Sequence, residues 1–266
     1  MKDASAKARE LYEARRTRTP IPPLTDTEPG LGMAEGYAVQ RELVAMLLAD
    51  GDRIIGYKAG LTSEPMQAMF GVDSPDYGPV LASTVFTSGD TLPMEAYIEP
   101  KAEAEIVFRL RKGLAGPDVT REQAAAAIGE AMAGIEIVDS RIERWRIKLA
   151  DTIADLASNG AMAVGNAIEL PADADPRLIG CVFSRNNEIV ATGVGVNALG
   201  DPVAVVAWLA NMLGEHGVAL EAGQLIMTGA LHAAVPMRPG DEFVAEFDRL
   251  GSVVVRASGY GGDRAR

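Results

Sequence analysis

The chain has very little of the usual nucleophile and soft-metal chemistry. Its 266 residues include one cysteine, Cys181, and two histidines, His216 and His232. No intrachain disulfide can form, so a reducing compartment is expected. A zinc site is disfavoured, because such sites draw most of their ligands from cysteine and histidine. The sequence also contains no phosphate-binding glycine loop, dinucleotide-binding fingerprint or nucleophile elbow.

Positive charge is also scarce, since the formal net charge is −12 at pH 7. A nucleic-acid partner is therefore not expected, because phosphate binding needs a basic surface. The first 18 residues interleave basic and acidic side chains without an apolar targeting segment, and no apolar run is expected to span a bilayer. The sequence predicts a cytoplasmic protein without a membrane partner.

Hydrophobic periodicity predicts an α+β fold with a helical N-terminal arm. Residues 1–70 are interpreted as the arm, packed on a mixed-β catalytic core formed by residues 71–266, and the two together as one structural unit. Helices are expected at 1–18, 33–49, 120–132 and 202–213, with a helical turn at 65–70.

Strands account for most of the expected core. They are predicted at 53–60, 99–110, 135–138, 225–228, 242–247 and 252–257, with a turn at 158–160 and a hairpin over 182–190 that turns at 185–187. Within 99–110 apolar and polar residues alternate, so Glu103 and Glu105 share the polar face of the strand.

These two carboxylates and Glu136 are the strongest candidates for chemistry. A Glu-x-Glu pair is by itself more typical of a solvated strand face. Glu136 is different, because it lies between Ile135 and Ile137 in a segment otherwise poor in charge. A buried carboxylate needs a cation or a set of hydrogen bonds. Three converging carboxylates would suit Mg²⁺ or Mn²⁺.

Four other residues have both a chemical and a plain structural interpretation. Lys58 lies in an apolar, glycine-flanked strand, and it either extends to solvent or is a desolvated acid–base group. Asp76 is either a general base or a turn residue. His232 either lines a pocket or sits neutral at a strand end. His216 lies at a helix end, where a structural role is favoured.

Several segments, in this order, resemble the 2-keto-4-pentenoate hydratase and 4-oxalocrotonate decarboxylase family of the fumarylacetoacetate hydrolase superfamily. The matching segments are 36–40, 56–63, 71–73 with 75–78, 100–108, 135–141, 151–155 with 157–158, 228–231 and 239–241. The resemblance covers about residues 20 to 257, and eight motifs in register make chance an unsatisfactory explanation.

The resemblance implies a mixed-β catalytic core of the fumarylacetoacetate hydrolase type and homo-oligomeric assembly. It implies a Mg²⁺ or Mn²⁺ ion held by Glu103, Glu105 and Glu136. It also implies that Lys58 is an acid–base residue with Asp76 nearby. The candidates for substrate binding are Ser158, Leu231 and His232.

The activity that the resemblance implies is hydration of a 2-hydroxyalka-2,4-dienoate to a 4-hydroxy-2-oxo acid. The substrate partner is then a small 2-oxo or 2-hydroxy-dienoic acid from aromatic catabolism, and a complex with a neighbouring pathway enzyme is a further expectation. The first alternative is decarboxylation of a 2-oxo-3-enedioate, for which Arg144, Arg146 and Lys148 are possible sources of a basic contact to the distal carboxylate. The second is C–C hydrolysis of an acylpyruvate with His232 as base. The third is a non-catalytic partner subunit.

The sequence departs from the family pattern at three positions. Leu156 stands where the family usually has asparagine, Tyr57 replaces an arginine before the lysine, and Asp201 replaces the histidine of a Gly-His-Pro segment. From the sequence we expect Leu156 to cost hydrogen-bonding capacity near the site. We expect Tyr57 to remove a guanidinium that steers an anion.

Overall fold

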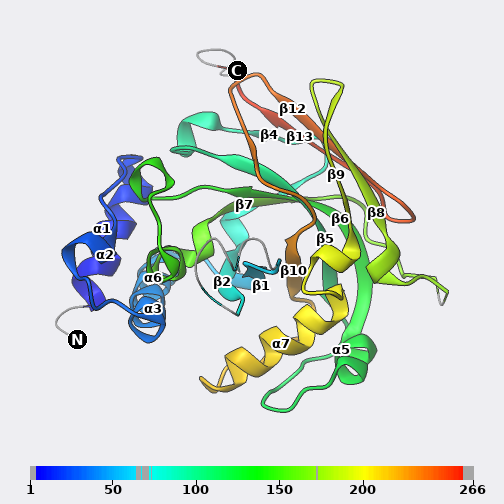
Figure 1. The fold of residues 1–266 in the computed structure, drawn as a ribbon, viewed down its shortest axis with the longest axis horizontal. Coiled ribbons are helices and arrows are strands. Elements are labelled where there is room, and N and C mark those ends of the chain that lie inside the picture. Colours follow the sequence, from blue (N-terminus) through cyan, green and yellow to red (C-terminus); the bar gives the residue numbers. More distant parts are fainter. Residues whose placement is uncertain (1–3, 64–66, 68–71, 73, 172, 260–266) are drawn as a thin grey trace.

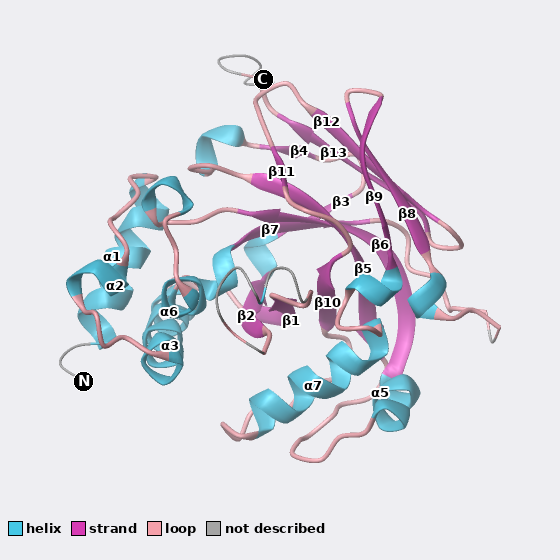
Figure 2. Ribbon diagram, viewed as in Figure 1, coloured by secondary structure: helices cyan, strands magenta, loops and turns pink. Residues whose placement is uncertain are grey.

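The computed structural model describes residues 4–259 apart from 64–66, 68–71, 73 and 172. In this part of the chain the strands form two sheets, and helices lie at the side and below them (Figures 1 and 2). The larger, eight-stranded sheet has the order β2-β1-β10-β5-β6-β7-β3, with β11 paired to β5. The five-stranded sheet has the order β4-β13-β12-β8-β9.

The strands are mostly short. They are β1 (Ile54–Gly60), β2 (Asp76–Leu81), β3 (Val85–Thr87), β4 (Thr91–Leu92), β5 (Lys101–Leu110), β6 (Ile128–Val138), β7 (Asn159–Val164), β8 (Gly180–Arg185), β9 (Glu188–Val194), β10 (Leu225–Ala230), β11 (Val235–Pro236), β12 (Glu242–Phe247) and β13 (Gly251–Ala257). The helices are α1 (Ala4–Thr17), α2 (Leu24–Thr27), α3 (Met33–Ala49), α5 (Arg121–Ala127), α6 (Leu149–Ala154) and α7 (Pro202–Gly214). Short 3₁₀ turns are η1 (Ala82–Thr84), η2 (Met94–Ala96), η3 (Glu143–Trp145), η4 (Leu156–Ser158), η5 (Pro176–Leu178) and η6 (Gly195–Asn197).

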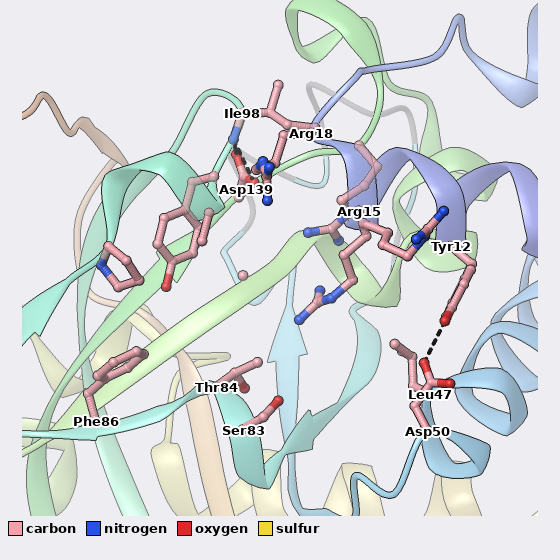
Figure 3. Close-up of a pocket in the computed structure, with 16 residues that line it drawn as sticks. Tyr12, Arg15, Arg18, Leu47, Asp50, Ser83, Thr84, Phe86, Ile98 and Asp139 are labelled. Atoms are coloured by element: carbon pink, nitrogen blue, oxygen red, sulfur yellow. Dashed lines mark hydrogen bonds between the residues drawn. The ribbon is translucent and has the colours of Figure 1, made fainter. Parts of the chain in front are cut away.

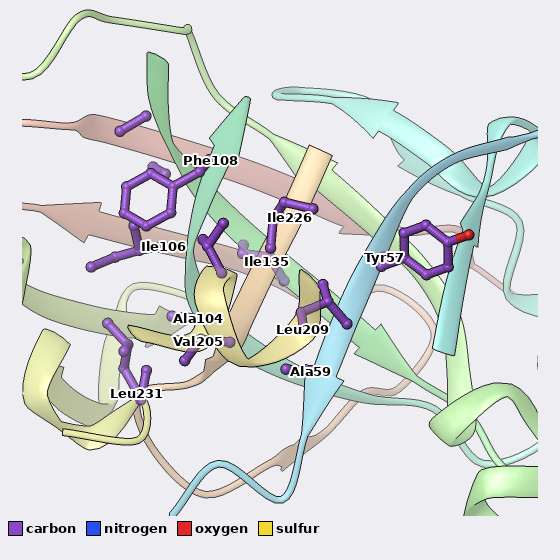
Figure 4. Packing of buried hydrophobic residues seen from close by; sticks show 14 of the residues in the cluster. Tyr57, Ala59, Ala104, Ile106, Phe108, Ile135, Val205, Leu209, Ile226 and Leu231 are labelled. Carbon is purple, nitrogen blue, oxygen red and sulfur yellow. The ribbon is translucent and has the colours of Figure 1, made fainter. Parts of the chain in front are cut away.

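The two faces of the larger sheet have different neighbours. One face packs against α7 and the smaller sheet in the main core, to which Phe108, Ile226 and Leu209 contribute (Figure 4). The opposite face carries a smaller buried cluster that includes Val107 and Met162. Because successive side chains of a strand alternate, the odd-numbered residues of β5 from Lys101 to Arg109 lie on this second face.

The helical arm packs on the core through an apolar cluster of its own. Leu11 of α1 and Leu43 of α3 meet Ala154 of α6, which belongs to the core region. In Figure 1 the arm and α6 lie together at one side of the sheets. The helical part of the arm ends at Ala49, and β1 that follows is a strand of the larger sheet. The proposed division at residue 70 stays a prediction.

Most predicted elements are confirmed within the described residues. The helix at 33–49 has the predicted bounds, and those at 1–18 and 202–213 match α1 and α7 closely. The 182–190 hairpin turns at Asn186 and Asn187, both with positive φ. The predicted turn at 65–70 falls largely outside the described residues.

Two element predictions were wrong. The helix expected over 120–132 ends at Ala127, because residues from Ile128 onward pair with β5. Gly134 therefore does not end a helix but lies within β6, directly opposite Glu105. The turn expected at 158–160 lies at 156–158 instead, and Asn159 already begins β7.

One apolar segment is longer than expected from the sequence, where no apolar run was expected to span a bilayer. Gly195–Gly214 is long and apolar enough for a membrane span by length and composition. In the structure, however, Leu199 and Gly200 have positive φ and separate η6 from α7. The 13 residues of α7 span about 20 Å, less than the ~30 Å of a bilayer core. Half of the segment is buried within the fold, as is typical of a core helix.

Gly229 marks an irregularity in β10 that the site depends on. The register between β10 and β5 shifts between Met227 and Ala230, and Gly229 in the shift has φ +103°. A methyl group at this position would overlap the side chain of Thr62. Only glycine adopts this backbone without strain and also leaves the room.

We expect Gly229→Ala to lower the free energy of unfolding by about 3 kcal/mol or more, because strain and steric overlap add. Urea unfolding measures this loss. Gly240→Ala is the matched control, since Gly240 has φ +87° with no atom within 4 Å of the added methyl. Its loss should be about 1–2 kcal/mol. Equal losses in the two variants would contradict the role assigned to the Thr62 contact.

Candidate active site

Three carboxylates converge on the second face of the larger sheet, the one that carries Val107 and Met162. Glu103 on β5 lies directly opposite Glu136 on β6, and Glu105 follows two residues further along β5. One oxygen of each lies within 4.8 Å of those of the other two. The two-residue spacing and the antiparallel register therefore place all three side chains on one face, as the alternating sequence predicted.

Burial leaves two carboxylate oxygens of this group without partners. Glu105 is 0% exposed and Glu136 is 1% exposed. Glu105 Oε2 accepts a hydrogen bond from the Gly229 backbone N–H at 2.9 Å. Glu105 Oε1 and Glu136 Oε2 have no hydrogen-bond partner in the described part of the chain. A solvated strand face is thereby excluded for Glu105 and Glu136.

Lys58 on β1 provides the cation closest to these groups. Its Nζ lies 3.0 Å from Glu136 Oε1 and donates to the Ala157 carbonyl oxygen at 2.9 Å. The side chain is buried, so the alternative in which it extends to solvent is wrong. Burial alone would lower the pKa of Lys58, but the carboxylates, Glu136 foremost, raise it above its ordinary value. Lys58 is therefore a buried ammonium group.

A strained turn holds the carbonyl that Lys58 contacts. Leu156, Ala157 and Ser158 have φ values of +58°, +51° and +54°. L-residues in this region are disfavoured by about 1 kcal/mol or more each. Gly78, which pairs with Lys58 across β1 and β2, has no side chain, and this lets the Leu156 carbonyl approach closely. The turn is thus pressed against the strands beside Lys58.

Asp76 lies on the same side of the sheet as Lys58, opposite Gly60 in the pairing of β2 with β1. It is buried, and neither carboxylate oxygen has a hydrogen-bond partner among the described residues. Burial raises the pKa of Asp76 to about 6, while Lys58 lowers it and Glu136 raises it. Asp76 is thus a buried residue of β2 rather than a plain turn residue, and its role as a general base stays a prediction.

Negative charge exceeds positive charge in this group. Burial first, and then Glu136, raises the pKa of Glu103 to about 7 and that of Glu105 well above its ordinary range. Lys58 only partly offsets these effects. The unpartnered buried oxygens and the all-carboxylate donor set fit a hard divalent cation, for which oxygen ligands are preferred.

Lys101 and Trp145 lie at the more open end of the carboxylate row. Along this face of β5, Lys101 and Glu103 are partly buried, whereas Glu105 is fully buried. The Lys101 Nζ lies 4.0 Å from the centre of the Trp145 ring, in a cation–π contact. Burial lowers the pKa of Lys101, and Glu103 partly opposes this. The positive charge of Lys101 therefore lies at the more exposed end of the carboxylate row.

The other predicted site residues, Ser158, Leu231 and His232, lie in different surroundings. Ser158 is buried in the strained turn, with its hydroxyl 3.3 Å from that of Thr152. Leu231 is buried in the main core (Figure 4). His232 accepts a hydrogen bond from the Ala104 N–H through Nε2, and its Nδ1 lies 2.9 Å from the Ala233 carbonyl. The structure does not bring Leu231 and His232 to the carboxylates, and their substrate-binding roles stay predictions.

The three departures from the family pattern lie outside the carboxylate group. Leu156 is buried in the apolar cluster of the arm, so no amide is lost from the site. Tyr57 points away from Lys58 into the main core. Asp201 caps α7 by accepting from the Val203 N–H at 2.9 Å and pairs with Arg121.

Three groups near the site were missed by sequence reasoning. They are the Gly229 N–H on Glu105, the Ala157 carbonyl on Lys58 and Asn159, whose Nδ2 lies 3.4 Å from Glu136 Oε1. Two of the three are backbone groups, and the type of residue that carries a backbone group does not reveal such a contact. Asn159 resembled a turn residue.

Residues 59–257 match the model of the fumarylacetoacetate (FAA) hydrolase C-terminal family. A 2-hydroxyhexa-2,4-dienoate hydratase from Comamonas testosteroni is 38% identical over 252 residues, 94% of this chain and 96% of that protein. A 2-keto-4-pentenoate hydratase from Paraburkholderia xenovorans is 39% identical over an alignment that covers 92% of this chain and 91% of that protein. The structure of 4-oxalocrotonate decarboxylase from Pseudomonas putida, complexed with magnesium and adipate, superimposes with a TM-score of 0.92 at 35% sequence identity. The superposition covers 96% of this chain and 97% of that one.

The pKa shifts predict how stability depends on pH. A carboxyl group whose pKa is higher in the folded than in the unfolded state destabilises the fold increasingly as pH rises above its unfolded value. In metal-free protein, Glu105→Gln should therefore gain stability relative to wild type as the pH rises above about 4.5, the ordinary pKa of this side chain. Thermal unfolding in the presence of a chelator measures the difference.

The same variant tests metal binding at about pH 7.5. Mg²⁺ should raise the Tm of wild type, because a ligand that binds only the native state stabilises it. It should raise the Tm of Glu105→Gln much less. A variant that follows wild type at every pH, with and without Mg²⁺, would contradict the strained carboxylate cluster.

Proposed function

The chain belongs to the fumarylacetoacetate hydrolase family, and we propose that within it the protein is a divalent-metal-dependent hydratase. The substrate is a 2-hydroxyalka-2,4-dienoate and the product a 4-hydroxy-2-oxo acid. The observation that carries the proposal is the convergence of Glu103, Glu105 and Glu136 beside the buried ammonium group of Lys58. Relatives named as hydratases of such dienoates match this chain nearly end to end.

The carboxylates Glu103, Glu105 and Glu136 would hold Mg²⁺ or Mn²⁺. When bound, the cation stabilises negative charge on the C2 oxygen of the substrate. The Gly229 N–H orients Glu105, and Lys58 orients Glu136. These contacts leave one oxygen of each carboxylate free to bind metal.

Lys58 and Asp76 move the protons. The substrate loses its C2 hydroxyl proton and gains one at C5, which converts the dienol into an α,β-unsaturated ketone. Asp76, with a pKa of about 6, suits the acceptor, and the protonated Lys58 suits the donor. Water then adds its oxygen to C4 and a proton to C3, completing the hydration.

Decarboxylation of a 2-oxo-3-enedioate is the second candidate, because 4-oxalocrotonate decarboxylase is so similar in structure. The same electron sink at C2 accepts the electron pair that CO₂ leaves behind. This reaction needs a cation for the distal carboxylate. Arg146 is already paired with Asp26 and Glu143, whereas Lys101 lies next to the site.

The remaining alternatives have less support. Acylpyruvate hydrolysis was assigned His232 as base, but both ring nitrogens face backbone groups. A non-catalytic subunit would have no need for three clustered carboxylates, two of them fully buried, beside a lysine. Homo-oligomeric assembly, a cytoplasmic location and a complex with a neighbouring pathway enzyme stay predictions.

Product mass spectrometry tests the proposed function. Purified metal-free protein is given 2-hydroxypenta-2,4-dienoate and 2-oxohex-3-enedioate together, with and without Mg²⁺. We expect Mg²⁺-dependent addition of water to the first and no change in the second. Loss of CO₂ from the second would favour the decarboxylase. Failure to convert either would overturn both.

Lys58→Met is the matched control for this assay, because it keeps the length of the side chain but not its charge. Its turnover should fall about 10²- to 10⁴-fold, as expected for loss of a proton-transfer group. Activity that survives in this variant would point to a contaminating hydratase or to a different acid.

Lys101 should affect substrate capture more than the chemical step. Lys101→Met is expected to raise KM for the anionic substrate about tenfold or less, with kcat nearly unchanged. Lys101→Arg, which keeps the charge, should restore most of the loss. Steady-state kinetics at two ionic strengths measure both. An unchanged KM in Lys101→Met would contradict the role of this charge at the open end of the site.

A further inference from the structure

We propose that the cavity between α1 and the larger sheet is a second binding site, for a small organic anion carrying a carboxylate or phosphate group. The cavity has a volume of about 410 Å³. It is enclosed by α1, the end of α3, η1 with β3, the η2 loop and the residues that follow β6 (Figure 3). None of Lys58, Asp76 and the three clustered carboxylates lines it, so it is separate from the candidate active site.

The cavity gathers positive charge in a chain whose net charge is −12. Four arginines line it, against two aspartates; the arginines are Arg15, Arg16, Arg18 and Arg141. The aspartates already have partners within the fold. Asp139 accepts from the backbone N–H groups of Ile98 and Glu99, and Asp50 accepts from the Tyr12 hydroxyl.

Two of these arginines have no partner among the described residues, Arg15 and Arg18, and Arg18 is exposed. Arg141 donates to Asp155 and to the Asn159 carbonyl, and Arg16 pairs with Glu13. Arg15 is half-buried and makes no ion pair or hydrogen bond within the described residues. Burial first, and then the nearby Arg141, lowers the pKa of Arg15 to about 10. An unpaired guanidinium that is partly removed from water is unfavourable, so an anion in the cavity would stabilise it.

The helix dipole does not account for this arrangement. Arg15 and Arg16 both lie in the last turn of α1, where the dipole favours cations. An exposed position would give the same benefit, as Arg16 shows. The packing of Leu11 and Ala14 against the core instead directs Arg15 inward, and Figure 3 shows its side chain extending into the cavity.

The walls define the class of ligand. Phe86, Leu47 and Ile98 contribute apolar surface, and the Tyr97 hydroxyl has no hydrogen-bond partner among the described residues. Guanidinium groups bind carboxylate and phosphate oxygens in pairs. The volume lies in the range of small-molecule sites. An apolar body with one oxyanion group fits these walls better than an inorganic ion.

Isothermal titration calorimetry on the metal-free full chain tests the proposal with three probes: benzoate, phenyl phosphate and inorganic phosphate. We expect at least one organic probe to bind more tightly than inorganic phosphate, and the better probe tells carboxylate from phosphate recognition. Arg15→Gln should weaken this binding at least tenfold. Arg9→Gln, an exposed change on α1 outside the cavity, and Glu105→Gln in the active site should leave it unchanged.

Thermal unfolding without a probe gives a second measurement. Arg15→Gln should have the same Tm as wild type or a higher one, because it removes a half-buried charge that lacks a partner. A Tm lower by several degrees would mean that the fold itself satisfies Arg15, and would overturn the proposal. Equal probe binding by wild type and Arg15→Gln, or no binding of any probe, would overturn it as well.

Discussion

Repulsion among buried carboxylates is the constraint on which the rest of this structure depends. Glu103 and Glu136 face each other across two antiparallel strands, and Glu105 lies two residues away. Like charges directly opposite on neighbouring strands are unfavourable in water and more so when buried. A divalent cation held by the three carboxylates would relieve this repulsion. The surrounding backbone is shaped to keep the cluster in place at this energetic cost.

Two backbone irregularities supply that support. The shift in β10 turns the Gly229 N–H toward Glu105, and the left-handed turn at 156–158 directs a carbonyl toward Lys58. The turn itself follows α6, which packs on α1 and α3. Leu156 belongs to that same apolar cluster, so the helical arm stabilises the turn that positions Lys58. Through this chain of contacts α1 and α3 support the site.

Sequence reasoning succeeded where the signal was local. Period-two alternation placed Glu103 and Glu105 on one face, and the isolated charge of Glu136 in an apolar segment indicated burial. It failed where distant segments decide the conformation. The stretch after Ala127 has good helix formers, but pairing with β5 outweighs that propensity. The contacts made by Gly229 and Ala157 involve backbone atoms. The surroundings of Arg15 come from distant segments, such as that of Arg141, which lies 141 − 15 = 126 positions further along the chain.

The positions of the family departures limit where substrate selectivity can arise. Leu156, Tyr57 and Asp201 differ from the family pattern, yet each lies in a core or at a helix cap. A metal ion held by the three carboxylates would serve hydration and decarboxylation equally, because both reactions need negative charge stabilised at the C2 oxygen. Selectivity must therefore come from groups that meet the far end of the substrate. Lys101, fixed against Trp145 at the open end of the carboxylate row, is the charged group best placed to do so.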